Sequence, residues 1–316
     1  MFDILSSIKQ NLELKSPIIN SAPKQFSHAP SRAMCYSSVD NKPIGACIRS
    51  VYLQNKQYPQ SNALSIYVRM TAEAGKIWET WLINQYKELG IYISHSTKLY
   101  DKEHHMSGEF DIVHKNLITG DVEITECKQY NGSNYYAAKS IIGSKDTAPA
   151  PKDAHLLQCF DYLLMCKNTD NESIETVNLL YLDRSCGSFY NNFQFVIKLN
   201  LNNDGTYSPH ISYKSFEGFY NHYIDERITD TNIYSKNDML MTFIDNEIIP
   251  PRDYQLKYDE KTIDEKVLNK EISVSKYTKY KQDKDKNFIG DFNCVYCAFG
   301  PGLDGFSTCY SLENEE

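Results

Sequence analysis

The sequence predicts an α/β fold in which a central mixed β-sheet is flanked by helices. Three observations lead to this prediction. Residues 66–89 have the apolar spacing of a helix, residues 91–130 contain successive strand-like segments, and residues 153–201 resemble a helix followed by two further strands. Helices and strands in this order are typical of a mixed sheet covered by helices. The 316 residues are enough for one large domain with additions, or for two small domains.

The N-terminal part of the chain is predicted to be mainly helical. Residues 1–30 contain a short helix-like segment and then a Pro/Ser-rich stretch, and a further helix is expected to begin within 46–53. The helix over 66–89 should end at Gly90, because a glycine readily adopts the positive φ of a helix C-cap.

The middle of the chain supplies the predicted sheet. Short alternating segments indicate strands, and the turn residues at 116–121 predict a hairpin between two of them. The expected strands are 91–100, 108–115, 121–130, 176–184, 192–201 and 212–216. Helices are expected over 153–167 and 215–246, whereas 250–287 is charged and weakly patterned.

We divide the chain into four parts on this basis. Residues 1–30 form an N-terminal arm, 31–200 the core, 201–290 an additional helical or irregular region, and 291–316 a cysteine-bearing tail that packs on the core.

Composition narrows the class of protein. Hydrophobic residues make up 41% of the chain and charged residues 23%, which favours a packed core over disorder. The net charge of −8 argues against attraction of nucleic acid by the protein as a whole, but it does not exclude a local basic groove. The sequence shows neither a membrane span nor a signal peptide, so we expect a cytoplasmic protein without a membrane partner.

Asp111, Glu126 and Lys128 form the strongest candidate site. Alternation along 121–130 places Glu126 and Lys128 on one face of a strand, and Asp111 on the preceding strand can lie beside them. Two carboxylates that converge repel each other unless a cation lies between them, and oxygen ligands suit Mg²⁺ or Mn²⁺. A lysine at such a point can orient an attacking water and stabilise charge on a phosphate, which is what phosphodiester hydrolysis requires.

A Glu-x-Lys pair alone is more often a solvated pair across strands, so its neighbours matter. Glu79 follows Gly75 by four residues on the helix over 66–89. Gln158 and Tyr162 are also four apart, so they share one face of the helix over 153–167.

The order Gly-x-x-x-Glu, Asp, Glu-x-Lys and Gln-x-x-x-Tyr resembles the RecB-like branch of the PD-(D/E)XK nucleases. That branch includes the AddAB helicase–nucleases, phage exonucleases and CRISPR-associated RecB-like nucleases, and the resemblance covers roughly residues 45–185. It implies a restriction-endonuclease-like core, with Asp111, Glu126, Lys128, Gln158 and Tyr162 in catalytic roles. By the same resemblance Glu79 joins Asp111 and Glu126 as a metal ligand. Glu79 stands where the family often has His, and Glu126 where it often has Asp.

The resemblance implies a metal-dependent DNA exonuclease that acts on single strands or DNA ends in recombination, repair or phage DNA metabolism. It implies a nucleoid-associated protein, or one in the host-cell cytoplasm if it is phage-encoded, with a helicase or recombination partner. Three alternatives stay open: an endonuclease of the same fold, an RNA-processing nuclease, and a non-catalytic DNA-binding or scaffold protein.

The cysteines suggest a second centre. Cys294 and Cys297 form a Cys-x-x-Cys pair, and Cys309 follows twelve residues later. Such spacing lets thiolates hold one metal or cluster, and in a reducing compartment this is more common than a disulfide. Cys47 lies in a Cys-x-Arg-x-x-Tyr segment that resembles the same nuclease branch, whose iron–sulfur members hold a [4Fe–4S] cluster with one cysteine before the core and three after it.

Other interpretations of the cysteines remain. Zn²⁺ would accept the same four thiolates, Cys35 could replace Cys47, or the residues are free core cysteines. The others read as structural thiols: Cys127, Cys159, Cys166 and Cys186.

The sequence also offers candidates for contact with nucleic acid. Residues 128–146 contain tyrosines and glycines and are interpreted as a mobile loop beside the site. Basic residues flanking the site could line a phosphate groove: Arg32, Arg49, Lys139, Lys145 and Lys152.

Overall fold

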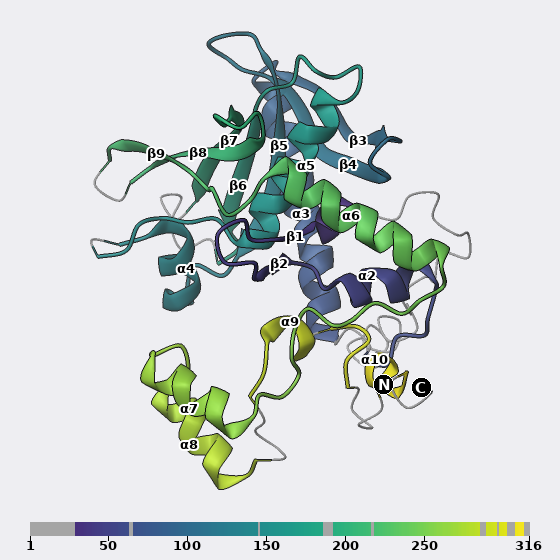
Figure 1. The fold of residues 1–316 in the computed structure, drawn as a ribbon. Coiled ribbons are helices and arrows are strands. Elements are labelled where there is room, and N and C mark those ends of the chain that lie inside the picture. The colour runs from purple at the N-terminus through teal and green to yellow at the C-terminus, as the bar shows by residue number, and fades with distance from the viewer. Residues whose placement is uncertain are drawn as a thin grey trace, which may run out of the picture.

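A seven-stranded mixed sheet lies at the centre of the molecule (Figure 1). The computed structural model describes residues 29–62, 66–144, 146–185, 192–215, 218–284, 289–295, 297–301 and 307–312. The strands follow one another across the sheet in chain order: β3 (Tyr92–Asp101), β4 (Met106–Lys115), β5 (Val122–Tyr130), β6 (Val177–Asp183), β7 (Phe193–Leu201), β8 (Tyr207–Lys214) and β9 (Tyr220–Ile224). The pair β5–β6 is parallel and the other neighbours are antiparallel. The α/β prediction with a mixed sheet flanked by helices is confirmed.

The parallel pair requires a crossover, and α4 (Tyr135–Ile142) and α5 (Asp153–Lys167) supply it. Every residue of α5 from Leu156 to Cys166 is buried. The helix packs between the sheet and the N-terminal elements, in a cluster that includes Phe160, Leu179 and Phe195. This apolar helix therefore fixes one face of β5, the strand that carries Glu126 and Lys128.

The other face of β5 is covered by the last turns of α3 (Ile66–Glu88), where Leu82 and Ile83 pack against Ile112. Gly90 has φ +70°, and the amides of Gly90 and Ile91 donate to the carbonyls of Lys87 and Tyr86, which is a Schellman C-cap. The predicted end of this helix is confirmed. The chain turns directly into β3, so α3 stands beside the strands of the site.

The N-terminal elements are held to the C-terminal half by several contacts, of which one buried carboxylate joins the most elements. They are η1 (Pro30–Arg32), β1 (Met34–Tyr36), β2 (Pro43–Gly45) and α2 (Ile48–Asn55). Asp253 accepts hydrogen bonds from the Tyr36 hydroxyl at 2.6 Å, the Ile48 amide at 2.7 Å and Lys236 Nζ at 2.6 Å. Lys236 belongs to α6 (Asp230–Asp245), so a single side chain joins β1, α2 and α6.

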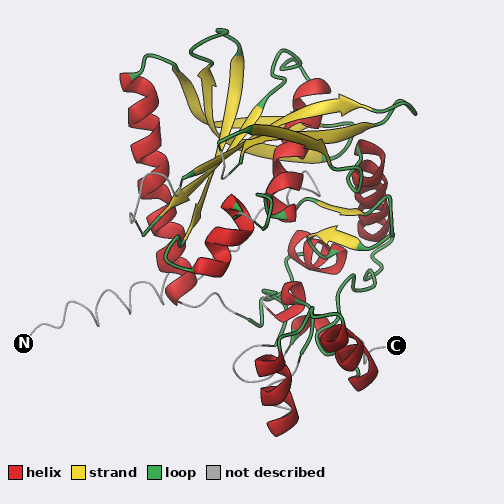
Figure 2. Ribbon diagram, turned by 90° about the vertical axis from the view of Figure 1, so that its left-hand side faces the viewer, coloured by secondary structure: helices red, strands yellow, loops and turns green. Residues whose placement is uncertain are grey.

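A small helical pair lies below the sheet in both views (Figures 1 and 2). It consists of α7 (Glu260–Leu268) and α8 (Val274–Gln282), which share an apolar cluster of Ile263, Ile272, Tyr280 and Ile289. The short helices α9 (Phe292–Val295) and α10 (Thr308–Ser311) follow, and α10 contacts α2. No helix within the described ranges is long and apolar enough to cross a membrane.

Two predictions of secondary structure made from the sequence are wrong. Residues 220–224 form β9 and not a helix, because the positive φ of Gly218 lets the chain turn back along β8. The interval 128–146, interpreted as a loop, contains α4. The proposed boundary at residue 200 cuts through the sheet, since β8 and β9 continue it. The helix expected within residues 1–30 lies almost wholly outside the described residues.

Candidate active site

The regular pairing of β4 with β5 ends just before the predicted acidic residues Asp111 and Glu126. Their paired register runs from Lys115↔Val122 to Ile112↔Thr125. At the next position the Asp111 carboxylate accepts a 2.8 Å hydrogen bond from the Cys127 amide, so a side chain takes the place of a β4 carbonyl. The divergence of the two strands opens a space that regular pairing would close.

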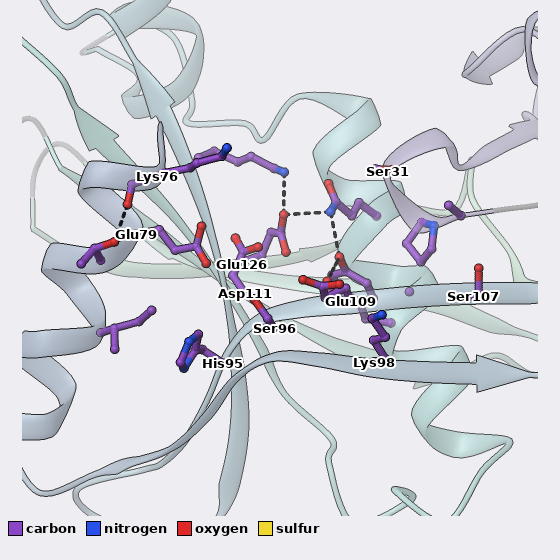
Figure 3. A pocket seen from close by; sticks show the side chains of 18 of the residues that line it. Ser31, Lys76, Glu79, His95, Ser96, Lys98, Ser107, Glu109, Asp111 and Glu126 are labelled. Atoms are coloured by element: carbon purple, nitrogen blue, oxygen red, sulfur yellow. Dashed lines mark hydrogen bonds and ion pairs between the residues drawn. The ribbon is translucent and has the colours of Figure 1, made fainter. Parts of the chain in front are cut away.

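Glu126 lies in this space and is 1% exposed. Its Oε1 accepts hydrogen bonds from Lys128 Nζ at 2.5 Å and from Gln158 Nε2 at 2.8 Å, whereas no described residue donates to its buried Oε2 (Figure 3). The prediction that Glu126 and Lys128 share a face is confirmed. A buried carboxylate oxygen without a donor is costly, so this oxygen marks the place where a cation would be favoured.

Gln158 and Tyr162 lie one turn apart on α5, and together they hold Glu126 in place through hydrogen bonds. The Gln158 Nε2 group also donates to the Tyr162 hydroxyl at 2.9 Å, and that hydroxyl donates to the Glu109 carbonyl at 2.8 Å. Gly108 allows the ring to come this close, because a Cβ there would lie 3.0 Å from the Tyr162 ring. The predicted pair on one helix face thus forms a hydrogen-bonded chain from β5 to β4.

The electrostatics of the site favour an added positive charge. Burial raises the pKa of Glu126 to about 7, and the negative charge of Asp111 contributes in the same direction. Burial also raises the pKa of Asp111 and that of Glu79. Burial opposes the charge on Lys128, but Glu126 and Asp111 outweigh it and raise the lysine pKa. The Lys128 ammonium thus acts on Glu126 and Asp111, while Lys76 is the cation that acts on Glu79.

Glu79 belongs to the same space. It lines a cavity of about 330 Å³ together with Asp111, Glu126 and Lys128. In Figure 3 the side chain of Glu79 projects from α3 toward Asp111 and Glu126. Among the described residues, no three His, Cys, Asp or Glu side chains are close enough to one another to hold a metal ion without movement.

A larger groove of about 870 Å³ leads away from the carboxylates between α3, β3 and η1. Its basic residues besides Lys128 are Lys76, Lys87 and Lys98. These three were missed from sequence, although Lys76, Glu79 and Lys87 recur at the spacing of one helix face. These three lysines therefore line the same groove as the acidic residues of the site.

The basic residues that sequence reasoning chose instead do not line this groove. Arg32, Arg49, Lys139 and Lys152 are absent from its lining, and Lys145 falls outside the described residues. Arg49 is buried, and it donates to the carbonyls of Pro250 and Cys309. The prediction that these four side chains form a groove at the site is wrong.

The four cysteines predicted to form a centre are close enough to influence one another electrostatically, but among the described residues no three of them are placed to hold a metal ion. Burial raises the pKa of Cys294 to about 12, and Cys47, Cys297 and Cys309 each add to that shift. Cys294 Sγ donates to the Tyr254 carbonyl at 3.3 Å. By contrast Cys35 packs in the main core with α5. Cys47, rather than Cys35, is thus the N-terminal cysteine that acts on the pKa of Cys294, and a metal centre at these residues stays a prediction.

The remaining thiols have no place in that group. Cys159 and Cys166 are buried in α5, and Cys127 lies on the β5 face that packs against α3. Cys186 falls outside the described residues. This agrees with the structural role predicted for the first three.

Comparison with known proteins finds no family model that matches the chain, and no curated protein that matches its sequence.

The raised pKa of Glu126 gives a testable pH dependence. Because its value of about 7 in the folded protein exceeds the ordinary 4.5, the folded state binds this proton more tightly than the unfolded chain. This stabilising contribution is fully present below the ordinary pKa and is lost as the pH rises through about 7.

We therefore expect metal-free wild-type protein to lose about 2–3 kcal/mol of stability relative to Glu126→Gln between about pH 5 and pH 8. The measurement is urea unfolding of both proteins in EDTA. Added Mg²⁺ should restore the wild type at the higher pH and leave the variant unchanged. Stability curves that run parallel at all pH values would contradict the assignment.

Proposed function

We propose that this protein is a divalent-metal-dependent nuclease with a restriction-endonuclease-like core, and that it hydrolyses phosphodiester bonds in DNA. The observation that supports this most directly is the buried Oε2 of Glu126, to which no described residue donates and which lies beside Asp111 and Lys128. Such an oxygen is readily explained if a cation completes the site. Its surroundings, a lysine and a groove with further cations, suit a phosphate ester.

The donor set fits Mg²⁺ or Mn²⁺, because carboxylate oxygens are the ligands that these ions prefer. Glu79, Asp111 and Glu126, which line one cavity, would hold the metal. When bound, the metal supplies Lewis acidity and a more acidic water. It would also offset the negative charge that raises the pKa of Glu126.

Lys128 has the geometry for the chemical step. Its ammonium group is held by Glu126 Oε1 and is mostly buried, so its position is defined before a substrate arrives. It can orient the attacking water and stabilise the charge that develops on the phosphate. Gln158 and Tyr162 act on Glu126, which they hold between β5 and β4. They are positioning residues in this arrangement.

The substrate is proposed to be single-stranded DNA or a DNA end. The groove carries Lys76, Lys87 and Lys98, which can contact backbone phosphates without reading a base sequence. No base-reading module is recognised in the sequence, which favours processing of ends or single strands over sequence-specific cutting. Recombination, repair or phage DNA metabolism would require such an activity.

The test is incubation of the purified protein with end-labelled single- and double-stranded DNA and RNA, in Mn²⁺ or in EDTA. Mn²⁺-dependent shortening of DNA from its ends supports the proposal. Cleavage of a circular single strand would identify an endonuclease, and preferential RNA cleavage an RNA-processing enzyme. Cleavage that persists in EDTA, or binding without any cleavage, would refute it.

We also propose that Cys47, Cys294, Cys297 and Cys309 hold a [4Fe–4S] cluster, with Zn²⁺ as the alternative. The grouping of these residues from both ends of the chain supports it. Cys47 is the N-cap residue of α2, and burial raises the pKa of its thiol, so a bound cation would be needed to favour the thiolate. Such a centre would join the N-terminal elements to the C-terminal segment.

Cys294→Ser is therefore expected to destabilise the protein by about 2–5 kcal/mol, because part of the binding energy of a structural centre is folding energy. Thermal unfolding and the absorption near ~400 nm are the measurements, since a [4Fe–4S] cluster absorbs there and zinc does not. Cys35→Ser is the matched control, a buried thiol outside the group that should retain any absorption band. Unchanged stability in Cys294→Ser would count against the centre.

A further inference from the structure

One side of the long helix α3 carries large apolar side chains that are exposed. Met70 is 57% exposed, Ile77 70% and Trp81 41%. Together with the half-buried Ala74 they follow one another at spacings of four, three and four residues, so they form a line along the helix that we call the α3 stripe. This is the spacing at which one helix packs along another, and an exposed apolar stripe of this kind often marks a surface that another element covers.

The other sides of α3 already have their contacts. Leu82 and Ile83 pack against Ile112 of the sheet, and Lys76 and Thr80 line the groove of the carboxylate site. No residue of the α3 stripe lines that groove, and none belongs to an apolar cluster of the described residues. A substrate in the groove would therefore leave the stripe exposed, so its partner has to come from elsewhere.

The sequence of residues 1–12 matches the α3 stripe. Its apolar side chains repeat the spacing of four, three and four residues, at Met1, Leu5, Ile8 and Leu12. On a helix Asp3, Ser7 and Gln10 would fall on the opposite side. Each set runs over eleven residue steps, about 16 Å along a helix, so the two lines agree in length. A helix of about 12 residues is marginal in water by itself, so such a segment needs an apolar surface on which to pack.

The place where the described chain begins brings this segment within reach of the stripe. Ala29 lines the groove together with Lys76 and Thr80, so the chain enters the described structure beside α3. Residues 13–28 lie between Ala29 and the matching segment, and sixteen residues span up to about 50 Å when extended. The helix α3 has 23 residues and is about 35 Å long, so every part of its stripe can be reached.

We propose that residues 1–12 form an amphipathic helix that docks on the α3 stripe of the same chain. Docking covers the exposed side chains of Met70, Ile77 and Trp81, and it removes the apolar face of the segment from water. It also holds α3, the helix that carries Glu79, between the sheet and the docked segment. This contact goes beyond the proposed hydrolysis, because it requires neither a metal nor DNA.

The tryptophan fluorescence of the full-length protein tests this directly. The chain has two tryptophans, Trp78 and Trp81, and both lie on α3 with their ring centroids 5.8 Å apart. Leu5→Ser combined with Ile8→Ser should shift their emission to longer wavelength and remove protection from quenching by acrylamide, because the docked segment would leave the stripe. Ile18→Ser combined with Ile19→Ser is the matched control, since it removes two aliphatic side chains from residues 13–28 and should behave like the wild type.

A peptide added to the double variant separates docking from a general loss of structure. A peptide of residues 1–15 should restore the emission and the protection of the Leu5→Ser, Ile8→Ser protein, since the α3 stripe of that protein is unchanged. The same peptide with both serine substitutions should restore neither. A protein that had merely unfolded would not respond to the first peptide.

Three results would overturn the proposal. The first is that the wild type and the double variant have the same emission and quenching, and the second is that the peptide restores neither property. The third is protection in the wild type that disappears on dilution, which would identify a second copy of the chain as the cover of the stripe. Because the assay involves no cleavage, its outcome is independent of whether the carboxylate site is a nuclease.

Discussion

Replacing Lys128 with methionine is expected to lower the rate of phosphodiester cleavage by a factor on the order of 10²–10⁴, the usual contribution of a positioned acid–base or charge-stabilising group. Methionine keeps most of the length and apolar volume of the stem, so the strand should remain in place. What is lost is the ammonium group that contacts Glu126 Oε1 at 2.5 Å. The measurement is single-turnover cleavage of end-labelled DNA in Mn²⁺.

Lys76→Met is the matched control. Lys76 lines the same groove but is exposed and pairs only loosely with Glu73, at 3.5 Å. Its loss should weaken substrate binding several-fold and leave the rate at saturating DNA nearly unchanged. If Lys128→Met retained the full single-turnover rate, the mechanism proposed for this site would be wrong.

Replacing Asp253 with alanine is expected to destabilise the fold by about 3–5 kcal/mol, the usual result of breaking a buried ion pair. Lys236 is 1% exposed and would lose the carboxylate that it contacts at 2.6 Å. The Tyr36 hydroxyl and the Ile48 amide would lose their acceptor as well. The change should appear as a lower midpoint of urea unfolding.

A double variant separates the ion pair from the packing. Lys236→Met with Asp253→Leu removes both charges, so it should recover a large part of the lost stability. Asp253→Asn should fall between alanine and the wild type, because an amide oxygen still accepts from Ile48. A loss below about 1 kcal/mol in Asp253→Ala would show that the carboxylate does not hold these segments together.

The central strands and the two long helices could be predicted from sequence because their apolar patterns are local. Alternation placed Glu126 and Lys128 on one face, and helical spacing placed Gln158 with Tyr162, and both relations are found. The groove lysines could not be assigned, because the orientation of α3 depends on how Leu82 and Ile83 meet the sheet. That contact is between segments far apart in the chain.

Elsewhere the local signal was ambiguous or absent. The strand β9 is polar and mostly exposed at the sheet edge, so no alternating apolar pattern reveals it. Asp253 is one acidic residue among many in the sequence, and only the fold shows that three elements converge on it. The cysteine spacing predicted a C-terminal group, and only the fold shows that Cys35 packs in the main core whereas Cys47 lies at the start of α2.

The parallel pair β5–β6 also determines the order in which the site can assemble. The strands β3, β4 and β5 are joined by short turns, so Asp111, Glu126 and Lys128 can come together early in folding. Gln158 and Tyr162 arrive with the crossover, whose closure brings segments together over a long stretch of chain and is therefore slower. A nascent chain that ends before β6 would carry the acidic residues and the lysine without the helix packing that orients them. The proposed hydrolytic activity would then appear only once the crossover has docked and β6 has paired with β5.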